Sequence, residues 1–184
     1  MKLTSQPSAI LPRVLLDKGI VRRFYEAQVR RGRGILPTSH QMDAVQVFVQ
    51  LLAVNNQLFI TAESFNVLQL RQPKYASGIL DNTKTLRKGR YLRRWARRLR
   101  DYVFTREDAV ILAYGSFGID PDSRCLGADA IVTGDLKMVT NLNTRQAEIK
   151  ERFDRMAENL PEPYRSASLP EIVTPAIVLS EWGK

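Results

Sequence analysis

The stretch GADAIVTGDLKM, Gly127–Met138, places a short apolar run directly before a carboxylate. Ala130–Val132 has the length and β-branched character of a buried strand, and Asp135 follows it after Thr133 and Gly134. In open α/β sheets, ligands bind outside the carboxyl ends of the strands. Asp135 is therefore placed where such a protein builds a site, and other acids in comparable positions would strengthen that interpretation.

Short apolar runs and helical patterns alternate along the rest of the chain. We expect strands at Arg13–Leu16, Leu58–Thr61, Ala130–Val132, Glu171–Val173 and Ala176–Leu179. We expect helices at Gly19–Arg31, from the Thr38-Ser39 cap to Asn55-Asn56, and at Ala62–Leu70, Arg106–Phe117 and Arg145–Leu160, the last capped by Thr144. Gly118–Gly127 is expected to be a loop. This alternation predicts an α/β sandwich with a mostly parallel sheet.

The composition limits the class of protein and the kinds of site that the chain can form. With 184 residues, 44% hydrophobic and 26% charged, the chain is expected to form one globular domain over residues 13–184, preceded by a lead-in at 1–12. No apolar run approaches the roughly 20 residues that span a bilayer, and the N-terminus lacks a signal core, so we expect a cytoplasmic protein without a membrane partner. Cys125 and His40 are the only residues of their kinds, which excludes an intramolecular disulfide, a thiolate zinc cluster and a His-rich metal site.

The net charge of +9 comes from one segment. Lys84–Arg100 holds nine basic residues and no acid, and a basic helix is expected around residues 81–101. Its apolar stripe, which includes Trp95, would dock the helix on the domain and disfavours a membrane surface as the partner. Such a block indicates a polyanion, with nucleic acid the first candidate and a merely solvated face the alternative. The residues expected to bind nucleic acid are Lys88, Arg90, Arg93, Arg94, Arg97 and Arg98.

Four acids follow expected strands or open expected helices: Asp17, Glu63, Asp108 and Asp135. Taken singly, each is also explained as a helix cap or a first-turn acid. If they converge, carboxylates that share a pocket repel one another and burial raises their pKa values, and a hard divalent cation relieves both costs. Ligation by oxygen alone suits Mg²⁺ or Mn²⁺.

The order of these acids resembles the PIN domain, a family of metal-dependent nucleases. The resemblance covers Val14–Asp17, Ile60–Glu63, Asp108–Ala113 and Ala130–Asp135, and Ile172–Pro175 is similar to the closing strand of the family. It implies a three-layer α/β/α sandwich with a mostly parallel central sheet. It also implies Mg²⁺ or Mn²⁺ as cofactor, RNA or DNA as partner, and hydrolysis of RNA by a metal-activated water. By resemblance, the catalytic and metal-binding residues are Asp17, Glu63, Asp108 and Asp135, while Asp129, at the other end of its strand, is structural.

Thr133 and Lys18 are expected to support this site. The chain departs from the family pattern at Lys18-Gly19, at Leu136–Met138, where a second acid is missing, and in the enlarged basic segment. These departures favour the alternative function, a catalytically inactive PIN-fold module that binds nucleic acid. A response-regulator-like phosphotransfer domain is disfavoured, because no Gly-rich phosphate loop is present. The sequence leaves open a homodimer and a protein partner such as an antitoxin.

Overall fold

The structure is a computed structural model that describes residues 12–54, 56–122 and 126–182. The expected lead-in lies outside the described residues except for Pro12, as does Cys125. Within the described ranges there are six strands, in the sheet order β4-β3-β2-β1-β5-β6. Their bounds are β1 (Arg13–Leu16), β2 (Gln57–Thr61), β3 (Lys84–Lys88), β4 (Gly118–Ile119), β5 (Ala130–Val132) and β6 (Glu171–Val173). Neighbouring strands are parallel except for β3 and β4, which pair antiparallel.

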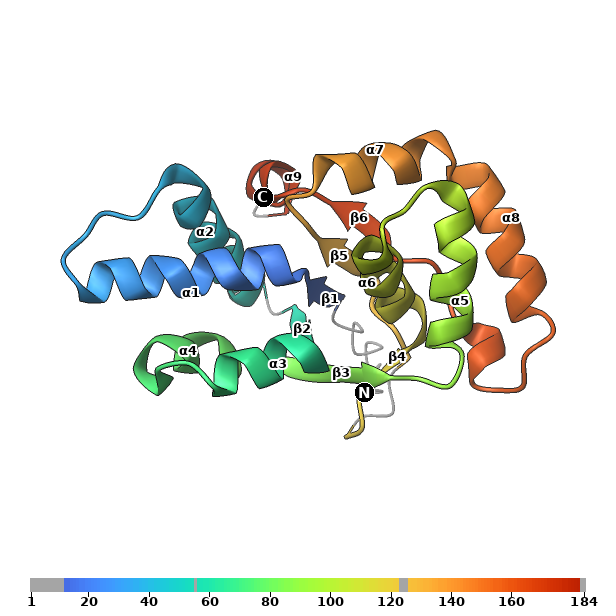
Figure 1. Cartoon of the computed structure of the whole chain (residues 1–184), viewed down its shortest axis with the longest axis horizontal. Helices are drawn as coiled ribbons and strands as arrows, with labels where there is room; N and C mark the ends of the chain where they lie inside the picture. Colours follow the sequence, from blue (N-terminus) through green and yellow to red (C-terminus); the bar gives the residue numbers. More distant parts are fainter. Residues whose placement is uncertain (1–11, 55, 123–125, 183–184) are drawn as a thin grey trace, which may run out of the picture.

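Helices connect the strands (Figure 1). They are α1 (Lys18–Gly32), α2 (Ser39–Ala53), α3 (Ala62–Gln69), α4 (Pro73–Leu80), α5 (Leu92–Leu99), α6 (Arg106–Phe117), α7 (Leu136–Thr144), α8 (Gln146–Ala157) and α9 (Pro175–Glu181), with 3₁₀ turns at Arg100–Tyr102 and Tyr164–Ser166. Threonine caps begin several of them: Thr38 and Thr105 form capping boxes, and Thr61 and Thr174 cap α3 and α9. No helix in the described part of the chain is long and apolar enough to cross a bilayer.

Alternate residues of the strands face two separate hydrophobic clusters. Leu15, Phe59 and Ile131 pack with residues of α5, α6 and α8. Their strand neighbours, such as Leu16 and Val132, pack with residues of α1, α2, α3, α4 and α9. A parallel sheet covered by helices on both faces has apolar residues at nearly every strand position, as β1, β2 and β5 do. The fold is therefore α/β with a mostly parallel sheet, and Figure 1 shows helices on both sides of it, an arrangement compatible with the expected three-layer sandwich.

The prediction of a helix over residues 81–101 is wrong for the first half of that range. Lys84–Lys88 forms β3, which pairs with β2 and β4, and the helix α5 begins only at Leu92. Leu86 is fully buried, while Thr85 is half-buried and Arg87 is exposed, so within this segment only Leu86 faces the core. Gly89 lies against the carbonyl of Phe117, where a Cβ would approach to 2.0 Å, so the chain passes too close to α6 for a helix to continue.

Three further expectations need correction. Ala176–Leu179 lies in helix α9 rather than in a strand, because Thr174 caps the helix and Pro175 opens it. Thr144 ends α7 instead of capping the next helix, and α8 covers the shorter range Gln146–Ala157. The expected loop from Gly118 contains β4, which pairs with the unexpected β3.

Candidate functional site

Three of the predicted acids lie at the carboxyl ends of neighbouring parallel strands. Asp17 directly follows β1, Glu63 lies in the first turn after β2, and Asp135 begins the helix after β5. The strands are adjacent in the order β2-β1-β5. The topology therefore brings these three chain positions to one edge of the sheet, as expected for a parallel α/β protein.

Thr133 connects Asp17 with Asp135. Its side chain is fully buried, and its Oγ1 donates a hydrogen bond to Asp17 Oδ2 over 2.9 Å. The same oxygen accepts a hydrogen bond from the backbone N–H of Asp135 over 3.1 Å. The backbone N–H of Thr133 donates to the carbonyl of Val173 in β6, which holds the threonine at the strand end. A single hydroxyl thus orients Asp17 and ties it to the loop that carries Asp135.

Asp17 is a half-buried carboxylate without an ion pair among the described residues. It occupies the N-cap position of α1, but its side chain makes no capping hydrogen bond there. Burial raises the pKa of Asp17, and this effect outweighs those that lower it, which come from the hydrogen bond of Thr133, the nearby backbone N–H groups of Lys18 and Gly19, and the charge of Lys18. Lys18, its neighbour in sequence, pairs with Glu107 instead. The charge on Asp17 is therefore incompletely compensated within the chain.

This imbalance predicts an unusual pH dependence of stability. Because the pKa of folded Asp17 lies above its ordinary value of 3.8, ionisation above that pH favours the unfolded state. We expect Asp17→Asn, measured in EDTA by denaturant unfolding, to be more stable than the wild type at neutral pH. The difference should disappear below pH 3.8. Asn keeps the acceptor for Thr133, so the comparison isolates the charge.

Glu63→Gln serves as a control of opposite sign. Although burial acts to raise it, the pKa of Glu63 is lowered below its ordinary value of 4.5 by hydrogen bonds from Lys88 and Tyr114. Its charge therefore stabilises the folded state above pH 4.5, and that contribution is lost as the pH falls below 4.5. Glu63→Gln should be less stable than the wild type at neutral pH. If both variants are more stable than the wild type, or if neither is, the charges of Asp17 and Glu63 do not have opposite effects on stability.

Both oxygens of Glu63 are engaged. Lys88 Nζ from β3 lies 2.5 Å from Oε1, and the hydroxyl of Tyr114 from α6 donates to Oε2 over 2.7 Å. Tyr114 is fully buried, and burial together with Glu63 raises the pKa of its hydroxyl well above the ordinary value, so it remains a donor. Lys88, which the sequence assigns to nucleic-acid binding, is thus the partner of an acid at the sheet edge.

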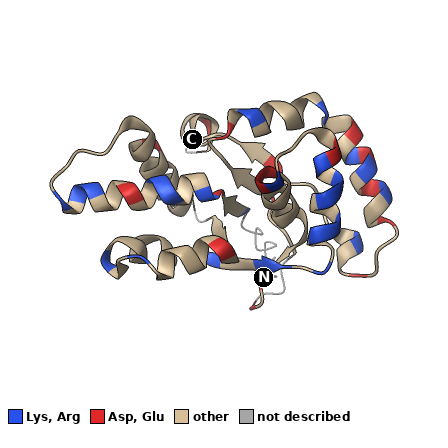
Figure 2. Ribbon diagram, in the orientation of Figure 1, with Lys and Arg blue, Asp and Glu red and all other residues tan. Residues whose placement is uncertain are grey.

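Asp108 forms the capping box of α6 with Thr105. Its N–H donates to Thr105 Oγ1 over 3.1 Å, and its Oδ2 accepts from the N–H of Thr105 over 3.2 Å. The next acid along this turn, Glu107, pairs with Lys18 and so brings the start of α6 against the start of α1. Figure 2 shows acidic positions at the starts of α3 and α6. Among the described residues, no three His, Cys, Asp or Glu side chains lie close enough together to hold one metal ion.

Arg23 is a residue at this edge that the sequence did not single out. Its Nη1 lies 2.6 Å from the position that a Cβ on Gly134 would take, so the guanidinium packs over the backbone between Thr133 and Asp135. Arg23 is half-buried and has no ion pair in the described part of the chain. Its neighbour Arg22 pairs with Glu26 on an ordinary charged helix face, and nothing in the local pattern distinguishes the two arginines.

The basic residues of α5 divide into two groups. Arg94 and Arg98 line a groove of about 510 Å³ together with residues of α8, whereas Arg93 and Arg97 are exposed and do not line it. Figure 2 shows the basic positions of α5 beside those of α8. Arg90 lies over the ring of Tyr91, 5.5 Å from its centroid. The groove includes two arginines, Arg152 and Arg155, that the sequence did not single out, because α8 mixes acids and bases and shows no excess charge.

Comparisons of the chain with protein-family models, with curated proteins and with solved structures found no match.

Proposed function

We propose that the protein is a metal-dependent endoribonuclease of the PIN type, with its catalytic edge at the carboxyl ends of β2, β1 and β5. The observation that carries this proposal is the pair of acids that follow adjacent strands, Asp17 after β1 and Asp135 after β5, connected by the buried hydroxyl of Thr133. Their order along the chain is the order that the PIN resemblance implies. The parallel sheet with helices on both faces is compatible with a PIN-like sandwich.

The donor set at this edge is of the chemical type that Mg²⁺ or Mn²⁺ prefers, and Asp17 and Asp135 are the two acids in it that Thr133 connects. Its ligating atoms are carboxylate oxygens, and Asp17 is a half-buried carboxylate with a raised pKa and no ion pair among the described residues. Asp17 and Asp135 would hold the ion, with Glu63 and Asp108 as the further candidates from the resemblance. Such an ion, when bound, polarises a phosphoryl oxygen and lowers the pKa of a coordinated water. The chain supplies the orientation: Thr133 fixes Asp17, and Arg23 places a positive charge beside the loop of Asp135.

RNA binding by the basic segment completes the proposal. The apolar face of α5 is buried, with Leu92, Trp95 and Leu99 at most 1% exposed, so the helix is docked and its arginines face outward. Arginine suits phosphate recognition because its guanidinium donates two parallel hydrogen bonds to a pair of oxygens. One-sided positive charge on an exposed helix is unfavourable in isolation, and phosphate groups would neutralise it.

A second candidate, a non-catalytic nucleic-acid-binding module, is favoured by a specific observation. Lys88 pairs with Glu63, and Lys18 pairs with Glu107, so two cations neutralise acids around the edge where a metal ion would sit. A chain that had lost its metal site would gain from such pairs, because they relieve the repulsion among carboxylates.

Incubation of the purified wild-type protein with single-stranded RNA distinguishes the two functions. The nuclease predicts cleavage that requires Mg²⁺ or Mn²⁺ and that EDTA stops, which also separates it from contaminating nucleases that need no metal. A DNA strand of the same sequence in parallel reactions identifies the preferred nucleic acid. Retained RNA binding without cleavage in either ion would replace the nuclease by the non-catalytic module.

A further inference from the structure

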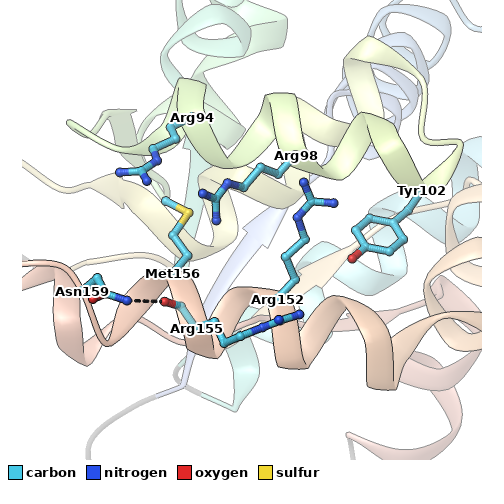
Figure 3. A pocket seen from close by; sticks show the side chains of 7 residues that line it. All are labelled: Arg94, Arg98, Tyr102, Arg152, Arg155, Met156 and Asn159. Atoms are coloured by element: carbon cyan, nitrogen blue, oxygen red, sulfur yellow. Dashed lines mark hydrogen bonds between the residues drawn. The ribbon is translucent and has the colours of Figure 1, made fainter.

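The groove between α5 and α8 is built from both helices. The rings of Trp95 and Phe153 meet edge to face with centroids 5.1 Å apart and hold the two helices together. Above this apolar contact, side chains from both helices extend into the groove (Figure 3). Its lining residues are Arg94, Arg98, Tyr102, Arg152, Arg155, Met156 and Asn159. Four guanidinium groups thus share one opening of about 510 Å³.

The groove holds more positive charge than the neighbouring acids neutralise. Arg152 pairs with Asp101 over 2.8 Å, and Arg155 pairs with Glu151 over 3.5 Å. In the described part of the chain, Arg94 and Arg98 have no ion pair. Burial lowers the pKa of Arg98, the nearby charges of Arg94 and Arg152 lower it further, and the smaller effect of Asp101 opposes them. These like charges repel one another, and an anion bound in the groove from outside the chain would relieve that repulsion.

We infer that this groove binds backbone phosphates of single-stranded RNA, with Arg94 and Arg98 as the principal ligands and with Arg152 and Arg155 completing the site. This inference rests on the proposed function only in naming RNA as the nucleic acid. Guanidinium groups donate paired hydrogen bonds to phosphate oxygens, and four of them surround one opening.

The shape and lining favour a single strand. A positively charged groove with an aromatic side chain beside it is the arrangement with which proteins bind single-stranded nucleic acid. Tyr102 supplies the ring, and Arg152 lies over it at 5.5 Å from its centroid. A membrane surface would require an apolar face for insertion, and the apolar face of α5 is buried in the core.

The chain also limits how far this groove lies from the proposed catalytic edge. Asp108 follows Tyr102 by six residues, and an extended chain covers about 3.5 Å per residue, so the two positions are at most roughly 21 Å apart. A single strand bound in the groove therefore lies within about 21 Å of the start of α6.

The helix α5 offers its own matched control. Arg94→Gln/Arg98→Gln removes the two groove arginines, and Arg93→Gln/Arg97→Gln removes two arginines of the same helix that do not line the groove. Both double variants lose two charges, so long-range electrostatics changes by a similar amount in each. Only the first pair removes direct phosphate ligands. Circular dichroism and thermal unfolding establish that both variants are folded.

The experiment measures binding of a fluorescent oligouridylate of about ten nucleotides, in EDTA, over a series of salt concentrations. We expect Arg94→Gln/Arg98→Gln to weaken binding about a hundredfold, since each of the two lost contacts to a charged group is worth about tenfold. Its slope of log K against log salt should be smaller by about 1.4, or 0.7 for each lost phosphate contact. The control pair should lose less of the affinity and less of the slope than the groove pair, because Arg93 and Arg97 lie outside the groove and contribute to binding only as neighbouring charges. Arg155→Gln should weaken binding in the same direction and so show the contribution of α8.

Equal losses in the two double variants would overturn the inference, because diffuse charge alone would then explain binding. Failure of the wild type to bind the oligonucleotide would overturn it as well, as would binding of phosphatidylserine vesicles in preference to RNA. Because EDTA stops metal-dependent cleavage, the result is independent of the nuclease proposal. If the protein binds RNA through the groove but never cuts it, this inference stands and the nuclease proposal fails. If the groove variants cut RNA as well as the wild type does, the nuclease proposal stands and this inference fails.

Discussion

Asp135→Asn is expected to reduce metal-dependent RNA cleavage by at least about a thousandfold while the protein stays folded. Stabilisation of transition-state charge by a bound metal ion is worth several kcal/mol, and each 1.36 kcal/mol corresponds to a tenfold change in rate, so losing an anionic ligand has an effect of about this size. Cleavage of a labelled RNA under single-turnover conditions in Mn²⁺ measures the loss. Asp17→Asn should produce a loss of similar size, because Thr133 connects the two residues.

The choice of Asn protects the fold in this experiment. Asp135 Oδ1 accepts the backbone N–H groups of Lys137 and Met138 and so caps α7. Asn caps helices about as well as Asp, so stability should change by less than about 0.5 kcal/mol.

Asp129→Asn is the matched control for the loss of an acid on β5. Asp129 precedes the same strand at its opposite end, where it pairs with Arg13 over 2.6 Å, in agreement with the structural role expected for it. Its replacement should leave the cleavage rate of the folded protein unchanged. Full cleavage by Asp135→Asn would place the catalytic edge elsewhere, and equal losses in the two variants would point to an effect on the fold.

Gly127→Ala is expected to lower the free energy of unfolding by about 2–5 kcal/mol, the sum of backbone strain and overpacking. Gly127 has φ +68°, in the left-handed region, and a Cβ there would lie 2.3 Å from the carbonyl oxygen of Gly115 in α6. Its N–H donates to Gly118, and the N–H of Ala128 donates to Gly115, both over 2.7 Å. The chain at Gly127 therefore docks the start of β5 against α6. Denaturant unfolding followed by circular dichroism measures the loss.

Gly34→Ala separates the two causes. Gly34 has a similar φ of +71°, but nothing lies within 4 Å of the position of its Cβ. Its replacement should cost only the conformational strain, about 1–2 kcal/mol. If both variants lose the same amount, the close approach of Gly127 to α6 contributes nothing to stability.

Local patterns in the sequence were sufficient for the elements that carry the acids. The strands Arg13–Leu16 and Ala130–Val132 and the helix Arg106–Phe117 are confirmed with their exact bounds. The strands are continuous apolar runs, and the helix begins at a threonine whose capping box closes within four residues. The placement of Asp17 and Asp135 at one sheet edge was also predictable, because parallel strands present their carboxyl ends together.

Contacts between distant segments determined the rest. Lys84–Lys88 contains one buried apolar residue, Leu86, so its strand conformation depends on hydrogen bonds to β2 and β4 that no local pattern reveals. The pairing of Lys88 with Glu63 follows from that strand. The groove depends in the same way on the packing of α5 against α8, which turns Arg94 and Arg98 toward Arg152 and Arg155. The pattern of a helix shows which of its residues share a face. Which other helix that face lies against is decided only when the core packs, because the burial of apolar surface favours no particular partner.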